Sequence, residues 1–331
     1  MPLYIKRSIF LFLFINLCLF AYNQVIKGTI LDNDTKNAIY SAAVYISGTS
    51  VGALSDKNGN FQLNISKYNS LPLTVSAIGY YSVTINDLTG GKPLLIYLNP
   101  KVFELNEVVV NAKSNPRKRR ENLTIFRNEF LGRSGNVLNC EIINEDDIIF
   151  ESSSDNNTLR AFASRPILID NRALGYKITY YLDKFEYEKE SKIFSFRGNI
   201  FFEEDSTTDK AKLQFFERKR RNAYLGSRMH FFRSLWINDL NENGFTVRNT
   251  ANEILNYNRI VFKVNNTKYL SYYSDLSISY YSKQPTSFII LLKDKVFFDA
   301  SGYFDASLII WEGEMSRQRI ADLLPYEYYP K

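Results

Sequence analysis

The chain has 331 residues, of which 45% are hydrophobic and 15% aromatic, so it contains enough apolar sequence to bury a substantial core. Its formal net charge is +6, and the basic excess falls on the first residues and on residues 111–121, whereas the remaining sequence is balanced. We therefore expect no binding of nucleic acid. His230 is the single histidine, which excludes a catalytic zinc site with two histidine ligands.

Residues 1–23 have the pattern of a secretory signal peptide. Two basic residues precede the apolar run 9–21, which as a helix would extend roughly 20 Å, less than the roughly 30 Å hydrocarbon core of a bilayer. We expect cleavage within 21–24, which leaves a mature protein that does not cross the membrane. Lipidation of Cys18 is the less favoured alternative, because Leu17 occupies the position where a small residue is expected.

Residues 24–110 contain short apolar alternations separated by turn residues, which is the pattern of consecutive β-strands. Gly59 ends a tight turn with the conformational freedom that a hairpin needs. About seven strands without helical periodicity between them predict an all-β sandwich. The predicted strands are 25–31, 43–47, 51–55, 61–65, 73–77, 81–85 and 94–98.

Several motifs of this segment are similar to one known family as a set. They are GTILD at 28–32, AAV at 42–44, GT at 48–49, SDKNGNF at 55–61, LTVSAIGY at 73–80 and LNEVVV at 105–110. The segment resembles the carboxypeptidase-regulatory-like domain (CarboxypepD_reg-like), a transthyretin-like sandwich. The family occurs at the N-terminus of TonB-dependent outer-membrane receptors and of other exported proteins of Gram-negative bacteria. The resemblance implies a structural or interaction module and no peptidase activity.

Residues 111–121, NAKSNPRKRRE, are interpreted as a basic linker. Pro116 and the charge run lack apolar periodicity, so a solvated, flexible spacer is expected between two domains. Contact with anionic lipid or lipopolysaccharide and processing by a trypsin-like protease are the alternatives.

Residues 122–331 are predicted to form an α+β domain of unknown function, with a mostly antiparallel sheet and a helical pair. A helix is predicted over 123–131, and the pair over 209–224 and from Ser227 onward. The sequence predicts strands at 167–169, 176–182, 193–202, 276–280 and 288–292, and a short helix at 316–324.

Sequence motifs with catalytic resemblance lack the context that they require. Gly48–Gly52 fits the G-x-S-x-G pattern, but a strand follows Ser50 where a nucleophile elbow needs a helix. Asp32–Asp34 resembles the start of a calcium loop, without its Gly and Glu. We therefore assign no catalytic, cofactor-binding or metal-binding residue and expect no cofactor; binding residues stay open.

Other chemistry-bearing residues are interpreted as structural. Cys140, the one cysteine after the signal peptide, is expected to be buried, and His230 to be structural or at the surface. Acidic pairs are expected at the solvated surface; they are Asp146-Asp147, Glu203-Glu204 and Glu312 with Glu314.

Adjacent aromatic pairs recur in the C-terminal region, for example Tyr280-Tyr281. Neighbours in a strand point to opposite faces, so both rings are core if the sheet is covered on both sides. If one face is open, a row of rings could stack on sugars or on a protein.

The sequence as a whole predicts an exported cell-envelope protein in the periplasm, at the outer membrane or secreted. It would act in binding, scaffolding or assembly, without catalysis, on a protein or glycan of the envelope, in peripheral association with the outer membrane. The alternative is a hydrolase of envelope or dietary glycans with its site in the C-terminal region. A deep cleft with two facing carboxylates would favour the hydrolase, and a flat aromatic face would favour binding.

Overall fold

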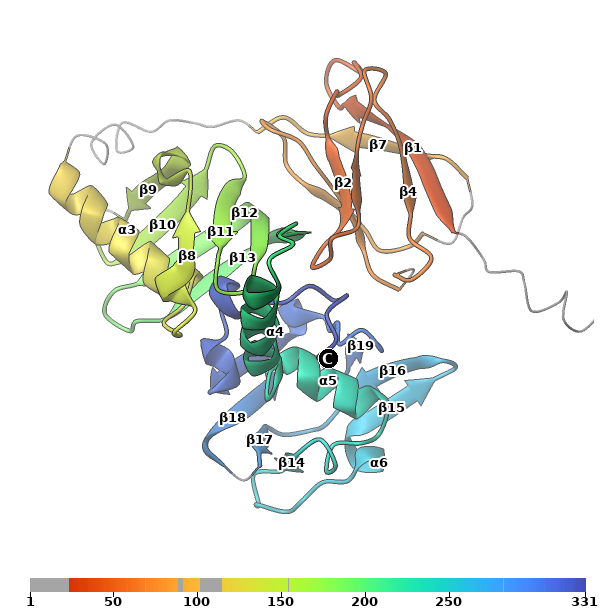
Figure 1. Ribbon diagram of the computed structural model, residues 1–331, viewed down its shortest axis with the longest axis vertical. Helices are drawn as coiled ribbons and strands as arrows, with labels where there is room; N and C mark the ends of the chain where they lie inside the picture. The colour runs from red at the N-terminus through yellow and green to blue at the C-terminus, as the bar shows by residue number, and fades with distance from the viewer. Residues whose placement is uncertain (1–23, 69, 89–91, 102–114, 154, 282) are drawn as a thin grey trace, which may run out of the picture.

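The computed structural model describes residues 24–68, 70–88, 92–101, 115–153, 155–281 and 283–331. The predicted signal peptide, including Cys18, and the residues from 102 to 114 lie outside the described residues. Figure 1 shows three bodies: an N-terminal sandwich, a first lobe that contains α3, and a second lobe that contains β14 to β20.

The N-terminal segment is a sandwich of two sheets, with strand orders β4-β1-β7 and β3-β2-β5-β6. β1 and β7 are parallel, and the remaining pairs are antiparallel. The seven predicted strands are confirmed, and so is the sandwich. They are β1 (Val25–Asp32), β2 (Ala43–Ile46), β3 (Gly52–Leu54), β4 (Asn60–Asn64), β5 (Leu73–Ser76), β6 (Val83–Ile85) and β7 (Leu94–Leu98).

Alternation along the strands builds the sandwich core. Ile26 and Ile30 of β1 belong to one buried cluster with Phe61 and Leu63 of the neighbouring strand β4, while Lys27 and Thr29 alternate with them on the other face. Gly28 lies between these positions because a Cβ there would come within 2.5 Å of the Leu94 carbonyl oxygen. The period of two is therefore sufficient to place the core of this domain.

Asp32 ends β1 and caps the turn that follows. Its carboxylate accepts hydrogen bonds from the backbone N–H groups of Asp34 (2.8 Å) and Thr35 (2.7 Å) and from the hydroxyl of Tyr80 (2.7 Å). The bond from Thr35, followed by that from Tyr80, lowers the pKa of Asp32 to about 2. The residue that begins the calcium-loop resemblance thus holds a turn.

We expect Asp32→Asn to flatten the acid dependence of the thermal midpoint. Because the folded pKa is depressed, this carboxylate stabilises the fold above its unfolded value of 3.8, and the stabilisation disappears as the pH falls toward about 2. Melting curves across that interval should decline more steeply for the wild-type chain than for Asp32→Asn. Parallel declines would show that Asp32 is not the titrating group.

The first lobe comprises residues 115–224 and 320–331 and has one hydrophobic core. Its sheet has the order β8-β11-β12-β10-β9, with β13 on the other side of the long strand β12, and all pairs are antiparallel. The elements are α3 (Pro116–Phe130), η1 (Val137–Asn139), β8 (Cys140–Ile142), η2 (Glu145–Asp147), β9 (Ile148–Ser152), β10 (Thr158–Ala163), β11 (Ile167–Asn171), β12 (Tyr176–Glu188), β13 (Phe194–Glu204), α4 (Lys210–Tyr224) and η5 (Ile320–Asp322).

The second lobe, residues 227–315, has a core of its own, built on two antiparallel sheets with the orders β14-β17-β18-β20 and β15-β16-β19. Its elements are α5 (Arg228–Trp236), β14 (Phe245–Arg248), α6 (Tyr257–Ile260), β15 (Val261–Val264), β16 (Thr267–Leu270), β17 (Leu276–Tyr280), β18 (Lys283–Leu291), β19 (Val296–Phe298), η3 (Ala306–Leu308) and β20 (Ile309–Gly313), and η4 (Met315–Arg317) leads out of the lobe.

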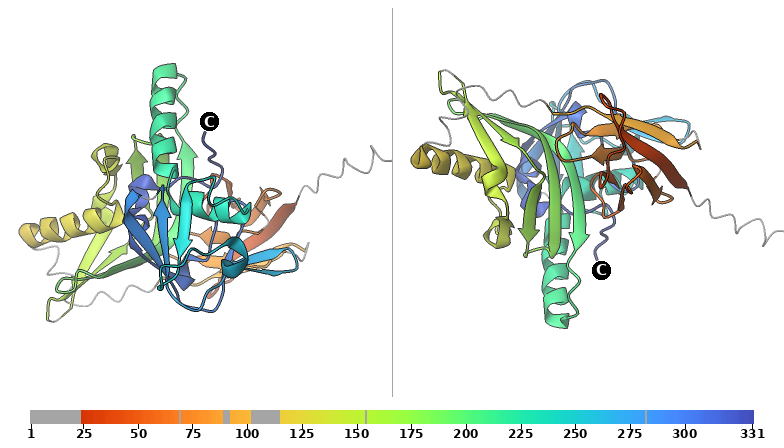
Figure 2. Two further views of the ribbon diagram at one scale, coloured as in Figure 1. Left: turned by 90° about the horizontal axis from the view of Figure 1, so that it is seen from below. Right: turned by 90° about the horizontal axis from the view of Figure 1, so that it is seen from above.

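The predicted α+β class, the antiparallel sheets and the helical pair are confirmed. Asp209 and Ser227 cap α4 and α5 through their side-chain oxygens, as such residues favour at a helix N-terminus. Both views in Figure 2 show α4 projecting from the body of the molecule. Residues 122–331 contain two hydrophobic cores, one in each lobe.

The interpretation of 111–121 as solvated linker is wrong from Pro116 onward. α3 begins at Pro116, and the Asn115 side chain accepts hydrogen bonds from the N–H groups of Arg117 and Lys118, both at 3.1 Å. Proline suits the first helical position, where its missing N–H costs nothing. The Arg119 guanidinium then donates to the carbonyl oxygens of Ile148 and Glu145. The short helix predicted at 316–324 consists instead of the 3₁₀ turns η4 and η5.

The sandwich docks on the first lobe through the loop between β2 and β3. Gly48 donates its N–H to the Ile200 carbonyl oxygen (2.8 Å), and the Phe202 N–H bonds the Thr49 carbonyl oxygen (3.0 Å). The Gly48 carbonyl oxygen accepts from the Tyr326 N–H at 2.8 Å. The loop thus covers the edge of β13, which would otherwise expose unpaired backbone groups.

Side chains extend this junction beside the loop. Tyr45 stacks on Tyr181 of β12 with ring centroids 5.4 Å apart, and the Thr74 hydroxyl donates to Asn199 at 3.3 Å. Ser70 donates to the carboxylate of Asp299 in the second lobe at 2.7 Å. Direct contacts therefore hold the sandwich against the C-terminal region, in addition to the chain that joins them.

Candidate functional site

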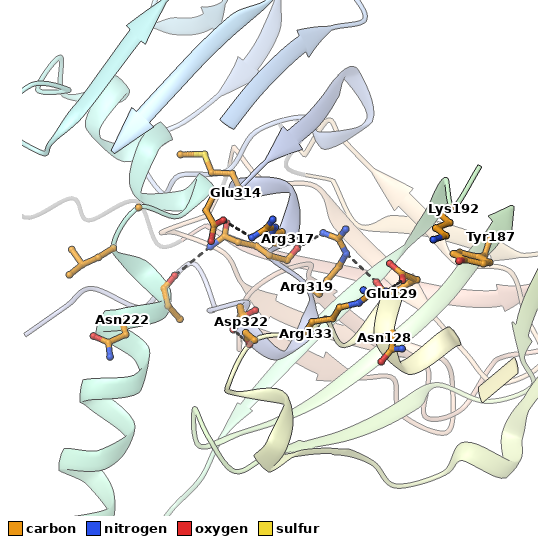
Figure 3. A pocket seen from close by; sticks show the side chains of 17 residues that line it. Asn128, Glu129, Arg133, Tyr187, Lys192, Asn222, Glu314, Arg317, Arg319 and Asp322 are labelled. Carbon is orange, nitrogen blue, oxygen red and sulfur yellow. Dashed lines mark hydrogen bonds and ion pairs between the residues drawn. The ribbon is translucent and has the colours of Figure 1, made fainter. Parts of the chain in front are cut away.

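A cleft of about 770 Å³ with several charged side chains in its lining lies between the two lobes (Figure 3). Four segments line it: the end of α3 with the turn after it, the hairpin between β12 and β13, the junction of α4 and α5, and the chain from Glu314 to Asp322. Its size falls in the range of ligand pockets in proteins. The cleft brings together charged side chains from segments that are distant in the chain, and we take it as the candidate binding site.

Gly132 fixes the wall formed by α3. Its φ of +102° lets the chain turn away after the helix, and the side chain of Arg319 packs over it, 2.9 Å from where a Cβ would lie. This approach allows the Arg319 Nε to donate to the Glu129 carbonyl oxygen at 3.1 Å. The Arg319 cation thereby supplies a hydrogen-bond donor to a carbonyl oxygen in the last turn of α3, where a positive charge is favourable.

Each carboxylate of the cleft lining is held by a neighbour. Glu129 pairs with Arg133 at 2.7 Å, and Glu314 pairs with Arg317 at 3.2 Å. Asp322 accepts hydrogen bonds from its neighbours on the turn after α3, namely the Ser134 hydroxyl at 2.6 Å and the Asn136 amide at 2.9 Å. Both ion pairs are local to one segment of the chain, three or four residues apart.

Asp322 is a partly buried acid of the cleft that forms no ion pair with the described residues. Partial burial raises the pKa of this carboxyl above its usual range, against the effect of its hydrogen bonds from Ser134 and Asn136 and of the charge of Arg319. It is the one acid of the cleft lining that no ion pair of the described residues includes.

Two partly buried arginines lie at the cleft without an ion-pair partner in the described residues. Arg319 also donates through Nη1 to the carbonyl oxygens of Ser316 and Gln318 and covers the ring of Phe194 at 4.5 Å. Arg228, directly behind the lining, donates to the Gln318 carbonyl oxygen at 3.1 Å. Burial lowers the pKa of both guanidinium groups, that of Arg228 to about 10, and Arg319 further disfavours the charge on Arg228.

The residues with catalytic resemblance serve structural roles outside the cleft. Ser50 donates through its N–H (2.7 Å) and its hydroxyl (2.9 Å) to Glu327 and so belongs to the sandwich junction. His230 is buried among aromatic rings, accepts the Gly226 N–H at Nδ1 (3.1 Å), and has a pKa lowered by burial. The structural interpretation of His230 is confirmed.

Cys140 occupies a structural position, and the acidic pairs are exposed except for the half-buried Asp147. Cys140 is buried in the first core, as predicted, and burial raises its pKa to about 12. Glu204 pairs with the buried Arg220 at 2.5 Å. Asp147 accepts from the Asn144 amide at 2.8 Å, and of the predicted pairs only Glu314 contributes a side chain to the cleft.

Both interpretations of the aromatic pairs occur in the structure. Phe231 and Phe232 are buried together in the second core, whereas Tyr273 is 84% exposed. On the outer face of β15-β16-β19, Phe262, which is 53% exposed, pairs with Tyr269, and Tyr269 pairs with Phe297. The rings therefore fill cores and also form a partly open row on one small sheet.

Sequence reasoning did not find the cleft, because its residues are distant in the chain. Glu129 and Arg319, joined by a hydrogen bond, lie 190 positions apart. The Arg-Gln-Arg sequence at 317–319 is the one local sign of a cationic site, and the sequence analysis assigned it to the predicted short helix. Neither the described residues 24–101 nor those from 115 onward contain a helix long and apolar enough to cross a membrane, or a group of three His, Cys, Asp or Glu suited to a metal.

Comparison with known families matches the N-terminal domain. The model of the CarboxypepD_reg-like domain matches residues 26–110, so this part of the chain is a CarboxypepD_reg-like domain, as the sequence motifs indicated. None of the curated proteins matches the chain.

Similarity to solved structures is distant. A cohesin–X-dockerin complex with a mutated N-terminal interface, from Acetivibrio cellulolyticus, matches with 17% identity and a TM-score of 0.21, covering 31% of this chain and 73% of that one. A 9R-lipoxygenase from Cyanothece matches with 11% identity and a TM-score of 0.19, covering 65% of this chain and 49% of that one. Scores this low carry no argument about fold or function.

Proposed function

We propose that this chain is an exported cell-envelope protein that binds a protein or glycan of the envelope in the cleft and leaves it chemically unchanged. The CarboxypepD_reg-like domain supports an envelope role, because the family occurs in exported proteins of Gram-negative bacteria. The signal-peptide pattern of residues 1–23 supports export. We propose a location in the periplasm or in peripheral association with the outer membrane.

The ion pairs of the cleft carboxylates are the main support for binding without catalysis. Glycoside hydrolysis needs an acid and a second carboxylate, roughly 5 to 10 Å apart and directed at one bond. Here Glu129 and Glu314 are tied to arginines of their own segments. Carboxylates held in ion pairs with arginines of their own segments form a pattern of donors and acceptors that is suited to recognition.

A hydrolase of envelope or dietary glycans is the alternative, and one observation favours it. Asp322 lies in the cleft with a pKa raised by burial, which is the property of a general acid. It would need Glu129 or Glu314 to leave its arginine and act as the second carboxylate. We therefore rank the hydrolase second.

We expect Leu225→Trp to abolish binding of the mature chain to isolated cell envelopes. Leu225 lines the cleft and is 40% exposed, so the larger indole side chain of tryptophan would fill ligand space there without removing a core contact. The measurement is co-sedimentation with washed envelope fragments, and the bound fraction should fall to the level of an unrelated protein.

Leu138→Trp is the matched control for this experiment. Leu138 lies outside the cleft and is 88% exposed, so the same substitution should leave co-sedimentation unchanged. Equal binding by both variants would place the envelope contact elsewhere on the molecule and refute the cleft as its site.

A further inference from the structure

The cationic side chains of the cleft exceed what its carboxylates neutralise. Arg133 and Arg317 are paired with Glu129 and Glu314, which leaves Arg319 and Lys192 in the lining and Arg228 behind it. Asp322 is the one remaining acid. The described cleft therefore carries an excess of positive charge in a partly buried space, where charges are weakly screened by solvent.

Arg319 is fixed in an orientation that presents a free donor. Its Nε and Nη1 are engaged by backbone carbonyl oxygens, which carry only partial charge, while Nη2 has no hydrogen-bond partner in the described part of the chain. Figure 3 shows the guanidinium group in the middle of the cleft, between Arg317 and Glu129. A guanidinium that is held rigid and lacks a counter-ion is suited to a carboxylate or a phosphate.

Lys192 supplies a second cation at the rim. It lies in the turn between β12 and β13 with φ of +57°, is exposed, and has no ion-pair or hydrogen-bond partner among the described residues. Figure 3 places it beside the ring of Tyr187. A cation next to an aromatic face, with amide side chains such as Asn128 and Asn222 also in the lining, is an arrangement that can bind a charged sugar.

We propose that the cleft binds an acidic saccharide, with the carboxylate or phosphate of the sugar between Arg319 and Lys192. The inference deepens the proposed function and rests on it, since it names the chemistry of the envelope ligand. An anion in this position relieves the repulsion between Arg319 and Arg228, two partly buried cations that form no ion pair in the described residues. The uronic acids and sugar phosphates of envelope glycans share this chemistry.

Calorimetric titration of the mature chain tests the proposal with three probes: galacturonic acid, glucose 6-phosphate and glucose. We expect saturable binding of at least one acid, at least about tenfold tighter than glucose, and weaker in high salt. The acid that binds distinguishes carboxylate from phosphate recognition. The inference would be overturned if glucose bound as tightly as both acids, or if neither acid bound.

Two variants locate the anion. Arg319→Gln should weaken binding by about tenfold or more, because it removes a charge-assisted donor. Lys192→Gln, at an exposed turn that tolerates substitution, should weaken it by about three- to fivefold. Lys189→Gln, in the same hairpin and outside the cleft, is the matched control and should bind as the wild type does.

The outcomes separate this inference from the proposed function. Unchanged affinity in both Arg319→Gln and Lys192→Gln would overturn the anion site, and if Arg319→Gln does not fold, Lys192→Gln alone decides. If neither acid binds while Leu225→Trp still abolishes envelope co-sedimentation, the inference fails and the cleft remains the envelope site. If Leu225→Trp binds envelopes normally, the proposed function itself fails.

Discussion

Arg233→Ala should lower the free energy of unfolding of the second lobe by about 4 kcal/mol. Arg233 is 6% exposed, and its guanidinium donates to the carbonyl oxygens of Ser301 (2.8 Å), Tyr328 (2.7 Å) and Tyr326 (3.0 Å). Removing it would leave three acceptors without a donor and would release the C-terminal segment from α5. The measurement is urea denaturation followed by tryptophan fluorescence, because both tryptophans, Trp236 and Trp311, belong to this lobe.

Arg218→Ala is the control for this variant. Arg218 is an exposed residue of α4 that covers the ring of Phe215, so its removal should cost less than about 0.5 kcal/mol. A loss below about 1 kcal/mol for Arg233→Ala would contradict the role of its guanidinium in holding the C-terminal segment.

Gly48→Ala should disrupt the docking of the sandwich on the first lobe. Gly48 has φ of +82°, and a Cβ there would lie 2.4 Å from the ring of Tyr326. The substitution therefore combines backbone strain with a collision at the docking loop. By hydrogen exchange, the amides of Phe202 and Tyr326, which donate across the junction, should exchange at least about tenfold faster than in the wild type.

Gly79→Ala separates the two causes. Gly79 has a similar φ of +84°, but no atom lies within 4 Å of the position of an added Cβ. It should show the strain without the collision, and the junction amides should keep their protection. Equal deprotection in both variants, or none in Gly48→Ala, would mean that the loop does not hold the sandwich in place.

The sandwich and the helical pair could be predicted because their signals are local. Alternation at Ile26 and Ile30 and a turn at Gly59 are read within a few residues, and Asp209 and Ser227 cap helices that begin at the next residue. The beginning of α3 was missed because four consecutive basic residues suggested solvated chain. Its cap at Asn115 and the proline after it were the contrary local signals.

The docking of the sandwich and the cleft could not be predicted, because both depend on contacts between distant segments. Gly48 meets Ile200 and Tyr326 only in the folded chain. Charge balance was also misleading: the C-terminal region is neutral as a whole, yet the fold gathers Arg319, Lys192 and Arg228 around one space. A sum over a region does not reveal where its charges meet.

The proposal that the cleft binds an envelope component without altering it is tested most directly by the co-sedimentation assay with a second readout on the same samples. Bound protein and newly released reducing ends would be measured together over time. We predict binding that Leu225→Trp abolishes, with reducing ends at the level of envelopes alone. Release of reducing ends by the wild-type chain, lost in Asp322→Asn, would contradict the proposal and identify a hydrolase.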